Sequence, residues 1–192
     1  RAPKMDPGGL FAPVSREGGL LINNLLLALA TATVLFGTLY PLFLEAITGD
    51  KISVGPPFFN ASFIPIMLPL VIVMGVGPFL SWKRADLPGV FDRLKWVIFI
   101  TLISLLVVWY MQTKGPALAV LAMAIAVWLL LATLREWSLR IKLGQVSFSE
   151  SRDRLRRVPR SSHGMTLAHA GLAVCIFGFV GSSAWKSEEV LF

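Results

Sequence analysis

Charged side chains are scarce in this sequence. Only 15% of its 192 residues are Asp, Glu, Lys or Arg, whereas 55% are hydrophobic, and a soluble domain usually carries about 25% charged residues. The mean hydropathy is +0.71. A chain with this composition cannot cover its surface with polar groups. The sequence therefore excludes a soluble enzyme and a protein that binds nucleic acid.

Cysteine and histidine are almost absent as well. Cys175 is the single cysteine, which excludes an intramolecular disulfide and a CxxC thiol relay. The two histidines are His163 and His169. The opening residues, RAPKMDPGGLFAPVSREGG, are polar, rich in proline and glycine, and lack the pattern of a secretory signal. We expect the chain to be a fragment of a longer protein.

Long hydrophobic runs dominate what the sequence does contain. Five runs hold no Lys, Arg or Asp, and their lengths bracket the roughly 20 residues that a helix needs to cross a bilayer. They cover residues 20–47, 63–82, 96–111, 117–134 and 165–185. The sequence therefore predicts an all-α integral membrane protein, in which residues 1–192 form a single region of about five transmembrane helices in the lipid bilayer.

The distribution of positive charge predicts how these helices are oriented. Fifteen of the 18 Lys and Arg residues lie before the first run, between the second and third, or between the fourth and fifth. Lys and Arg are retained on the cytoplasmic side during insertion. We therefore expect the amino end inside and the carboxyl end outside. A site for an anionic lipid or a partner in 135–160 is the alternative explanation for the charges of that segment.

The first hydrophobic run contains several polar residues. Asn23 and Asn24 favour hydrogen bonds to a neighbouring helix over ligand binding. Pro41 is expected to break the hydrogen-bond ladder of this run. Glu45 lies beyond that break, where we expect it to be solvated, and a role as a proton relay inside the bundle is the alternative.

The middle of the chain suggests structure but no chemistry. The GPP motif at 55–57 predicts an extended crossing, and the prolines and glycines of 63–82 predict a kinked helix. The run 117–134 has no group able to do chemistry, so we expect it to pack or to face lipid. After it, Ser147 and Glu150 have the spacing of a capping box, and Pro159 predicts where that helix stops.

The last run carries the most informative pattern. Six small residues at alternating spacings of four and three share one stripe of the helix: Gly164, Ala168, Gly171, Cys175, Gly178 and Ser182. Such a stripe suits close helix packing or the approach of a flat ligand such as a porphyrin. His169 is placed on its flank, inside the membrane, where an ionisable side chain indicates a function. His163 cannot reach the same iron from a continuous helix, and we expect it at the inner membrane surface.

The sequence resembles a known family. Its segment SREGGLLINNLLLALATATVLFGTLYPLFLEAITGDKISVGPPFFN and the later GMTLAHAGLAV closely resemble the later part of the CcmF/NrfE family, the heme lyase components of bacterial cytochrome c maturation. NNLLL, GTLYPL and SVGPPFFN stand in the family's order, and the resemblance covers essentially all 192 residues. Family proteins are longer, and their tryptophan-rich heme-handling segment has no counterpart in this sequence.

The resemblance implies a function and a set of partners. The family acts in the bacterial inner membrane, takes heme from a periplasmic heme chaperone and attaches it to the CxxCH thiols of apocytochrome c. The expected partners are that chaperone, the apocytochrome with its thiol-reducing and chaperone subunits, and the rest of the lyase. The carboxyl end would then face the periplasm. The resemblance places the attachment chemistry, and with it any catalytic residue, outside this chain.

The resemblance also implies a cofactor. The family holds a b-type heme between two histidines, and the AH of GMTLAH matches one of these ligands, so His169 is the expected axial ligand of the heme iron. The second ligand belongs to an earlier span that this chain lacks. Arg156, Arg157 and Arg160 are candidates to pair with the heme propionates, although the topology alone also explains their charge.

A second reading of the sequence remains open. In it, the chain is a scaffold or transporter bundle, and His169 is a hydrogen-bond partner between helices. Within the family, the sequence does not separate the general maturation protein from the paralogue dedicated to nitrite reductase.

Overall fold

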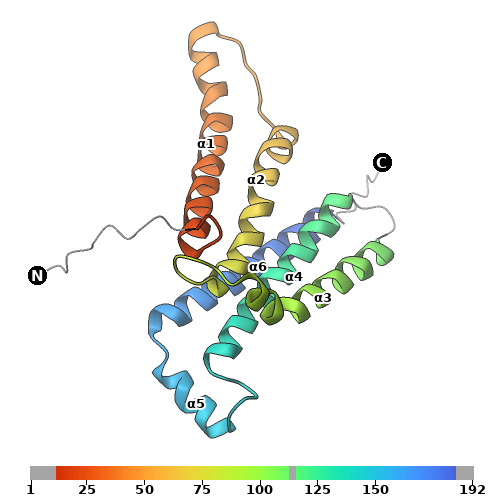
Figure 1. Cartoon of the computed structure of the whole chain (residues 1–192). Helices are drawn as coiled ribbons and strands as arrows, with labels where there is room; N and C mark the ends of the chain where they lie inside the picture. The colour runs from red at the N-terminus through yellow and green to blue at the C-terminus, as the bar shows by residue number, and fades with distance from the viewer. Residues whose placement is uncertain (1–11, 113–115, 185–192) are drawn as a thin grey trace, which may run out of the picture. The chain divides into compact units, whose positions relative to one another are not determined.

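The computed structural model describes residues 12–112 and 116–184, which are mostly helical and contain no strand. Five of the helices are long and apolar enough to cross a membrane (Figure 1). The predictions of an all-α fold and of about five spans are therefore confirmed. The chain divides into two compact units, Arg1–Asp86 and Leu87–Phe192.

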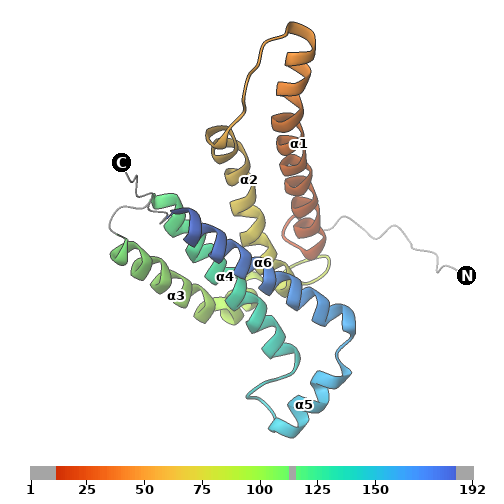
Figure 2. The same cartoon turned by 180° about the vertical axis from the view of Figure 1, so that it is seen from behind.

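The first unit is a pair of helices, α1 (Arg16–Thr48) and α2 (Pro56–Val76), followed by the short 3₁₀ helix η1 (Gly77–Phe79). The two long helices run side by side in opposite directions (Figures 1 and 2). Ser15 caps the start of α1, because its side-chain oxygen accepts a hydrogen bond from the Gly18 N–H at 3.1 Å. Gly49, with a φ of 78°, supplies the left-handed conformation that ends the helix.

Proline does not act in this unit as the sequence suggested. Pro41 lies inside α1, which continues through it to Thr48. The predicted extended crossing at 55–57 is wrong: Pro56 and Pro57 form the first turn of α2. The N–H groups in the first turn of a helix have no acceptor within the helix, so proline removes no hydrogen bond there.

The segment that follows α2 is hydrogen-bonded to the start of α1. The predicted span 63–82 ends too late, because η1 stops at Phe79 and Leu80 is extended. The chain then returns to the base of α1, where the Arg16 N–H donates to the Ser81 carbonyl at 3.0 Å. The Glu17 carboxylate accepts from the Lys83 N–H at 2.8 Å. These bonds satisfy backbone groups that a longer helix would have satisfied internally.

The second unit is built around α4 (Ala117–Arg140), which packs against both α3 (Leu87–Met111) and α6 (Arg160–Ala184). Its fully buried side chains include Val120 and Leu129, at 2% and 0% exposure. α3 begins nine residues before the predicted run 96–111, so the helix is long enough to cross a bilayer although the run has only 16 residues. Asp92 and Lys95 are tolerated in this first part because they form an exposed ion pair at 2.7 Å.

The helix boundaries near the charged connection differ from the predicted runs. α4 continues past 134 to Arg140, and α6 begins at Arg160 rather than at 165. Between them lies α5 (Phe148–Arg157), with Ser147 as its N-cap and the chain leaving the helix at Val158. The predicted helix start at Ser147 and the stop before Pro159 are therefore confirmed, and the Glu150 N–H donates to the Ser147 hydroxyl at 3.4 Å. The Glu150 carboxylate pairs with Arg154 instead of completing the capping box.

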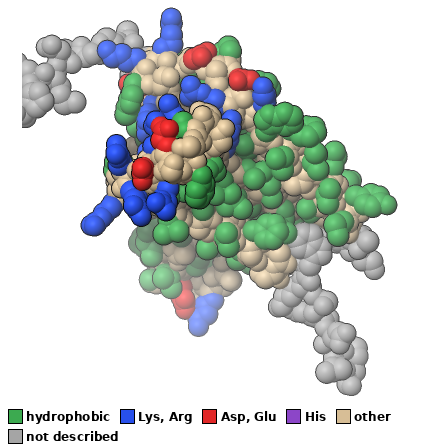
Figure 3. All heavy atoms as spheres, turned by 90° about the horizontal axis from the view of Figure 1, so that it is seen from below, with side chains coloured by type: hydrophobic (Ala, Val, Ile, Leu, Met, Phe, Trp, Pro, Cys, Tyr) green, Lys and Arg blue, Asp and Glu red, His purple; other side chains and the backbone are tan. Residues whose placement is uncertain are grey.

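Large hydrophobic side chains remain exposed along the long helices. Phe36 of α1, Tyr110 of α3 and Phe179 of α6 are 69%, 89% and 75% exposed. Figure 3 shows many such side chains on the face it draws. A soluble protein rarely exposes apolar surface on this scale, whereas lipid covers it at no cost. The chain is a multi-pass membrane protein.

Gly37 makes the close contact between α1 and α2 testable. A Cβ at this position would lie 2.8 Å from Cε1 of Phe58 and 2.9 Å from Cζ of Phe59. We expect Gly37→Ala to reduce the free energy of unfolding by about 1–3 kcal/mol, because it overpacks the contact. Unfolding in mixed detergent–SDS micelles, followed by circular dichroism, measures this change.

Gly171→Ala is the matched control, because a Cβ at Gly171 meets no atom within 4 Å. We expect it to be neutral or to stabilise the helix by up to about 1 kcal/mol. Equal losses of stability in both variants would contradict the packing argument.

Candidate functional site

The candidate site lies on the face of α6 that packs against α4. Ala173 is the buried residue of this face, at 2% exposure. His169, one turn earlier on the same side of the helix, is half-buried. Nearer the carboxyl end, the Met123 methyl lies 4.0 Å from the position of a Cβ on Gly181. His169 therefore belongs to the contact between α4 and α6.

The stripe of small residues lies elsewhere on α6. All six of its members are exposed, and a Cβ on Gly164, Gly171 or Gly178 would meet no atom within 4 Å. At 100° per residue, His169 is about 140° from the centre line of this stripe. His169 thus lies about 100° beyond the edge of the stripe at Ala168, and the structure shows that α4 covers the side of α6 that carries His169 and Ala173 rather than the stripe.

Glu136 is a functional candidate that the sequence analysis missed. The run 117–134 was expected to carry no chemistry, but α4 extends two turns further and brings this carboxylate into the contact with α6. Glu136 is only 9% exposed. An ionisable side chain buried in a helix that can span a membrane indicates a functional role by default. The sequence signal was the pair Glu136 and Arg140, four residues apart just beyond the apolar run.

Arg140 links this carboxylate to α6. Its Nε donates to Oε1 of Glu136 at 3.0 Å, and its Nη2 donates to the same oxygen. Its Nη1 donates to the Ser162 hydroxyl of α6 at 2.7 Å. The second carboxylate oxygen of Glu136, Oε2, is buried and has no hydrogen-bond partner among the described residues. Such an orphaned acceptor is rare in proteins.

His169 and Glu136 lie within electrostatic range of each other across the helix contact. The Glu136 carboxylate acts electrostatically on the His169 imidazole. Counted from the bonded pair Arg140 and Ser162, Glu136 is one turn along α4 and His169 is two turns along α6. Because α4 and α6 run in opposite directions (Figures 1 and 2), both residues lie on the same side of that pair along the helices.

The residues present fit one axial ligand of a heme. The imidazole of His169 is half exposed, so a ring nitrogen can reach a metal, and the orphaned oxygen of Glu136 offers the polar support that a ligating histidine needs. Among the described residues, no three His, Cys, Asp or Glu side chains group together so that they could hold a bare metal ion. His163, half-buried in the first turn of α6, lies about 9 Å along the helix from His169.

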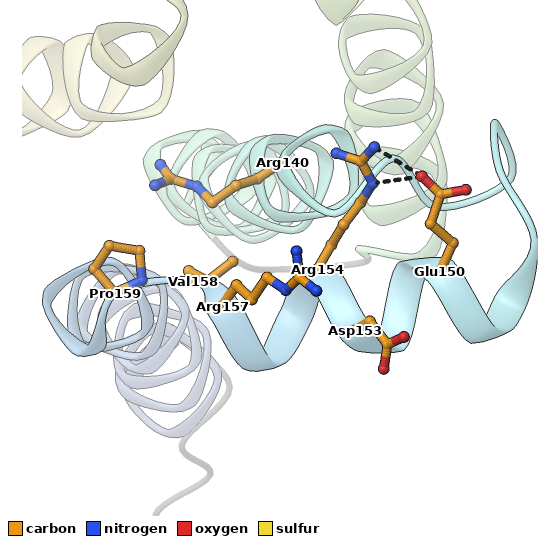
Figure 4. Close-up of a pocket in the computed structure, with 7 residues that line it drawn as sticks. All are labelled: Arg140, Glu150, Asp153, Arg154, Arg157, Val158 and Pro159. Atoms are coloured by element: carbon orange, nitrogen blue, oxygen red, sulfur yellow. Dashed lines mark hydrogen bonds and ion pairs between the residues drawn. The ribbon is translucent and has the colours of Figure 1, made fainter.

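The three predicted propionate partners lie apart from His169. Arg156 and Arg157 are exposed on α5, and Arg160, also exposed, begins α6 about 13.5 Å along the helix from His169. Arg157 lines a cavity of about 460 Å³ (Figure 4). The other lining residues are Arg140, Glu150, Asp153, Arg154, Val158 and Pro159. Arg154 is already paired with Glu150 at 2.8 Å.

The first unit also carries polar side chains within α1. Thr31, Thr33 and Thr38 donate their hydroxyls to carbonyls of their own helix. Glu45 is exposed and lies 3.6 Å from the ammonium of Lys51, as expected for a solvated carboxylate.

Comparison with known proteins identifies the family. No protein-family model matches the chain, and no solved structure matches it. The chain is 48% identical over 191 residues to the cytochrome c-type biogenesis protein CycK of Rhizobium meliloti. This alignment covers 100% of the chain and 28% of the relative. It is 38% identical over 177 residues to the cytochrome c-type biogenesis protein CcmF of Escherichia coli, over 91% of the chain and 26% of the relative.

A relative with the other family name matches as well. The cytochrome c-type biogenesis protein NrfE of Haemophilus influenzae is 33% identical over 190 residues, covering 93% of the chain and 26% of that protein. The chain thus spans between a quarter and a third of the length of these relatives. Within that span, the chain belongs to the CcmF/NrfE family of cytochrome c-type biogenesis proteins.

Proposed function

We propose that this chain is the heme-binding membrane part of a cytochrome c heme lyase in the bacterial inner membrane, and that His169 is an axial ligand of its b-type heme. The observation that carries the proposal is the half-buried imidazole inside a membrane-spanning helix, beside a buried carboxylate. The three relatives named above, all cytochrome c-type biogenesis proteins, support the biological process.

The chain's own residues would act by holding one side of the heme. His169 would donate a ring nitrogen to the heme iron. A heme with two histidine ligands supplies one-electron transfer and leaves no coordination position open to O₂. The second ligand, the transfer of heme from the periplasmic chaperone and the formation of the bonds to the apocytochrome thiols belong to the rest of the lyase. Arg156, Arg157 and Arg160 stay candidates for the propionates.

A scaffold or transporter role is the second candidate. The placement of His169 on the packed face of α6, close to Glu136, favours it, because this is also where a purely structural hydrogen bond between helices would form. The two candidates differ in whether removal of the imidazole removes heme or only weakens the helix contact.

Replacing His169 tests the proposal. The protein for this test is a chimera in which the chain replaces the matching segment of CycK from Rhizobium meliloti, to which it is 48% identical. We expect the chimera to support cytochrome c maturation in a strain that lacks CycK. His169→Ala should abolish its b-type absorbance, because the iron loses a ligand. A reduced-minus-oxidised spectrum of the purified chimera measures this loss.

His163→Ala is the matched control, and we expect it to keep the b-type absorbance. Both variants should insert into membranes at the level of the unmodified chimera, as measured by immunoblotting of the membrane fraction. Unchanged b-type absorbance after loss of His169 would contradict its role as a heme ligand and favour the scaffold or transporter role.

The proposed orientation is tested by the labelling of single cysteines. Cys175 is the chain's one cysteine, so Cys175→Ser gives a background without thiols. We expect Lys51→Cys to react with an impermeant maleimide on intact spheroplasts, and Arg156→Cys to react only after the membrane is opened, because positively charged segments stay in the cytoplasm. Both positions are exposed, so access to the reagent depends on the side of the membrane. The reverse pattern would overturn the proposed topology.

A further inference from the structure

We propose that Glu136 is the positioning residue of His169. Its free oxygen Oε2 accepts a hydrogen bond from the ring N–H of the imidazole, and this bond directs the other ring nitrogen to the heme iron. This inference rests on the proposed function. It adds a residue on a different helix, α4, to the heme site on α6.

The carboxylate is held so that only one of its oxygens is in use. Both guanidinium hydrogen bonds from Arg140 go to Oε1. Oε2 is buried without a partner among the described residues. Because a buried acceptor without a donor costs about 1–3 kcal/mol, the site is incomplete until a donor approaches.

The facing surface of α6 leaves one suitable donor. Ser162 is already engaged with Arg140 at 2.7 Å. The hydroxyl of Thr166 donates to the Ser162 carbonyl of its own helix at 3.0 Å. His169 is the next polar side chain on this face, is half-buried, and interacts electrostatically with Glu136. A hydrogen bond between the two side chains would therefore satisfy the carboxylate and fix the imidazole at the same time.

The chemistry of a ligating histidine requires such a partner. A neutral imidazole carries one N–H donor and one nitrogen with a free electron pair. Ligating histidines usually donate that N–H to a carboxylate, a carbonyl or water, which fixes the tautomer and raises the basicity of the coordinating nitrogen. A carboxylate partner therefore makes the histidine a stronger donor and favours the ferric state of the iron.

Glu136→Gln in the chimera with CycK tests this role. The substitution keeps the side chain's shape and removes its negative charge. We expect heme affinity to fall by about 10- to 100-fold. If the preference for ferric heme falls tenfold, the midpoint potential rises by about 59 mV. Potentiometric titration of the b-type absorbance measures the shift, and heme titration measures the affinity.

Glu150→Gln is the matched control, because Glu150 forms the same kind of pair with an arginine four residues later but lies on α5. We expect it to change neither quantity. Glu136→Asp should recover part of the affinity, and it carries the test if the glutamine variant does not insert into membranes.

The outcomes separate this inference from the function on which it rests. Wild-type potential and affinity in the Glu136→Gln chimera, with heme still dependent on His169, would overturn the role of Glu136 alone. A chimera whose b-type absorbance survives the loss of His169 would overturn both proposals. Equal shifts in the Glu136 and Glu150 variants would show a general effect of charge and would also overturn the positioning role.

Discussion

The burial of one carboxylate constrains the second half of this protein. Glu136 lies in the contact between α4 and α6, where water cannot solvate its charge. A buried charge that loses its partner costs about 3–5 kcal/mol, so Arg140 must stay on the same side of α4. Arg140 then reaches Ser162 and so fixes which turn of α6 lies opposite which turn of α4. The height of His169 relative to the carboxylate follows from this register.

Apolar packing supports the same arrangement. α4 is the helix with most of its surface covered, and many of its buried residues are small. They include Ala119, Ala124, Ala126 and Ala132. In a membrane, where lipid is as apolar as leucine, small side chains let helices approach closely enough for van der Waals contact. α3 and α6 can therefore both lie against α4 while their own large side chains point away from it.

Much of the fold could be predicted from the sequence, because the bilayer restricts the choices. The absence of water forces each backbone segment into a helix, so the apolar runs revealed all five long helices. The errors occur where proline or charge was taken as a boundary. Pro56 starts α2 rather than an extended crossing. Asp92 and Lys95 extend α3 beyond its apolar run, because they pair with each other at the exposed end.

The sequence by itself determined the class of protein, the number of spans, the position of His169 within the last span and the resemblance to the family. These features depend on composition and on local order along the chain. Only the tertiary structure decided which way His169 faces and that Glu136 lies beside it. Periodicity tells which residues share a face of a helix, but not which face another helix covers. That choice depends on packing and charge pairing between segments distant in sequence, here α4 and α6.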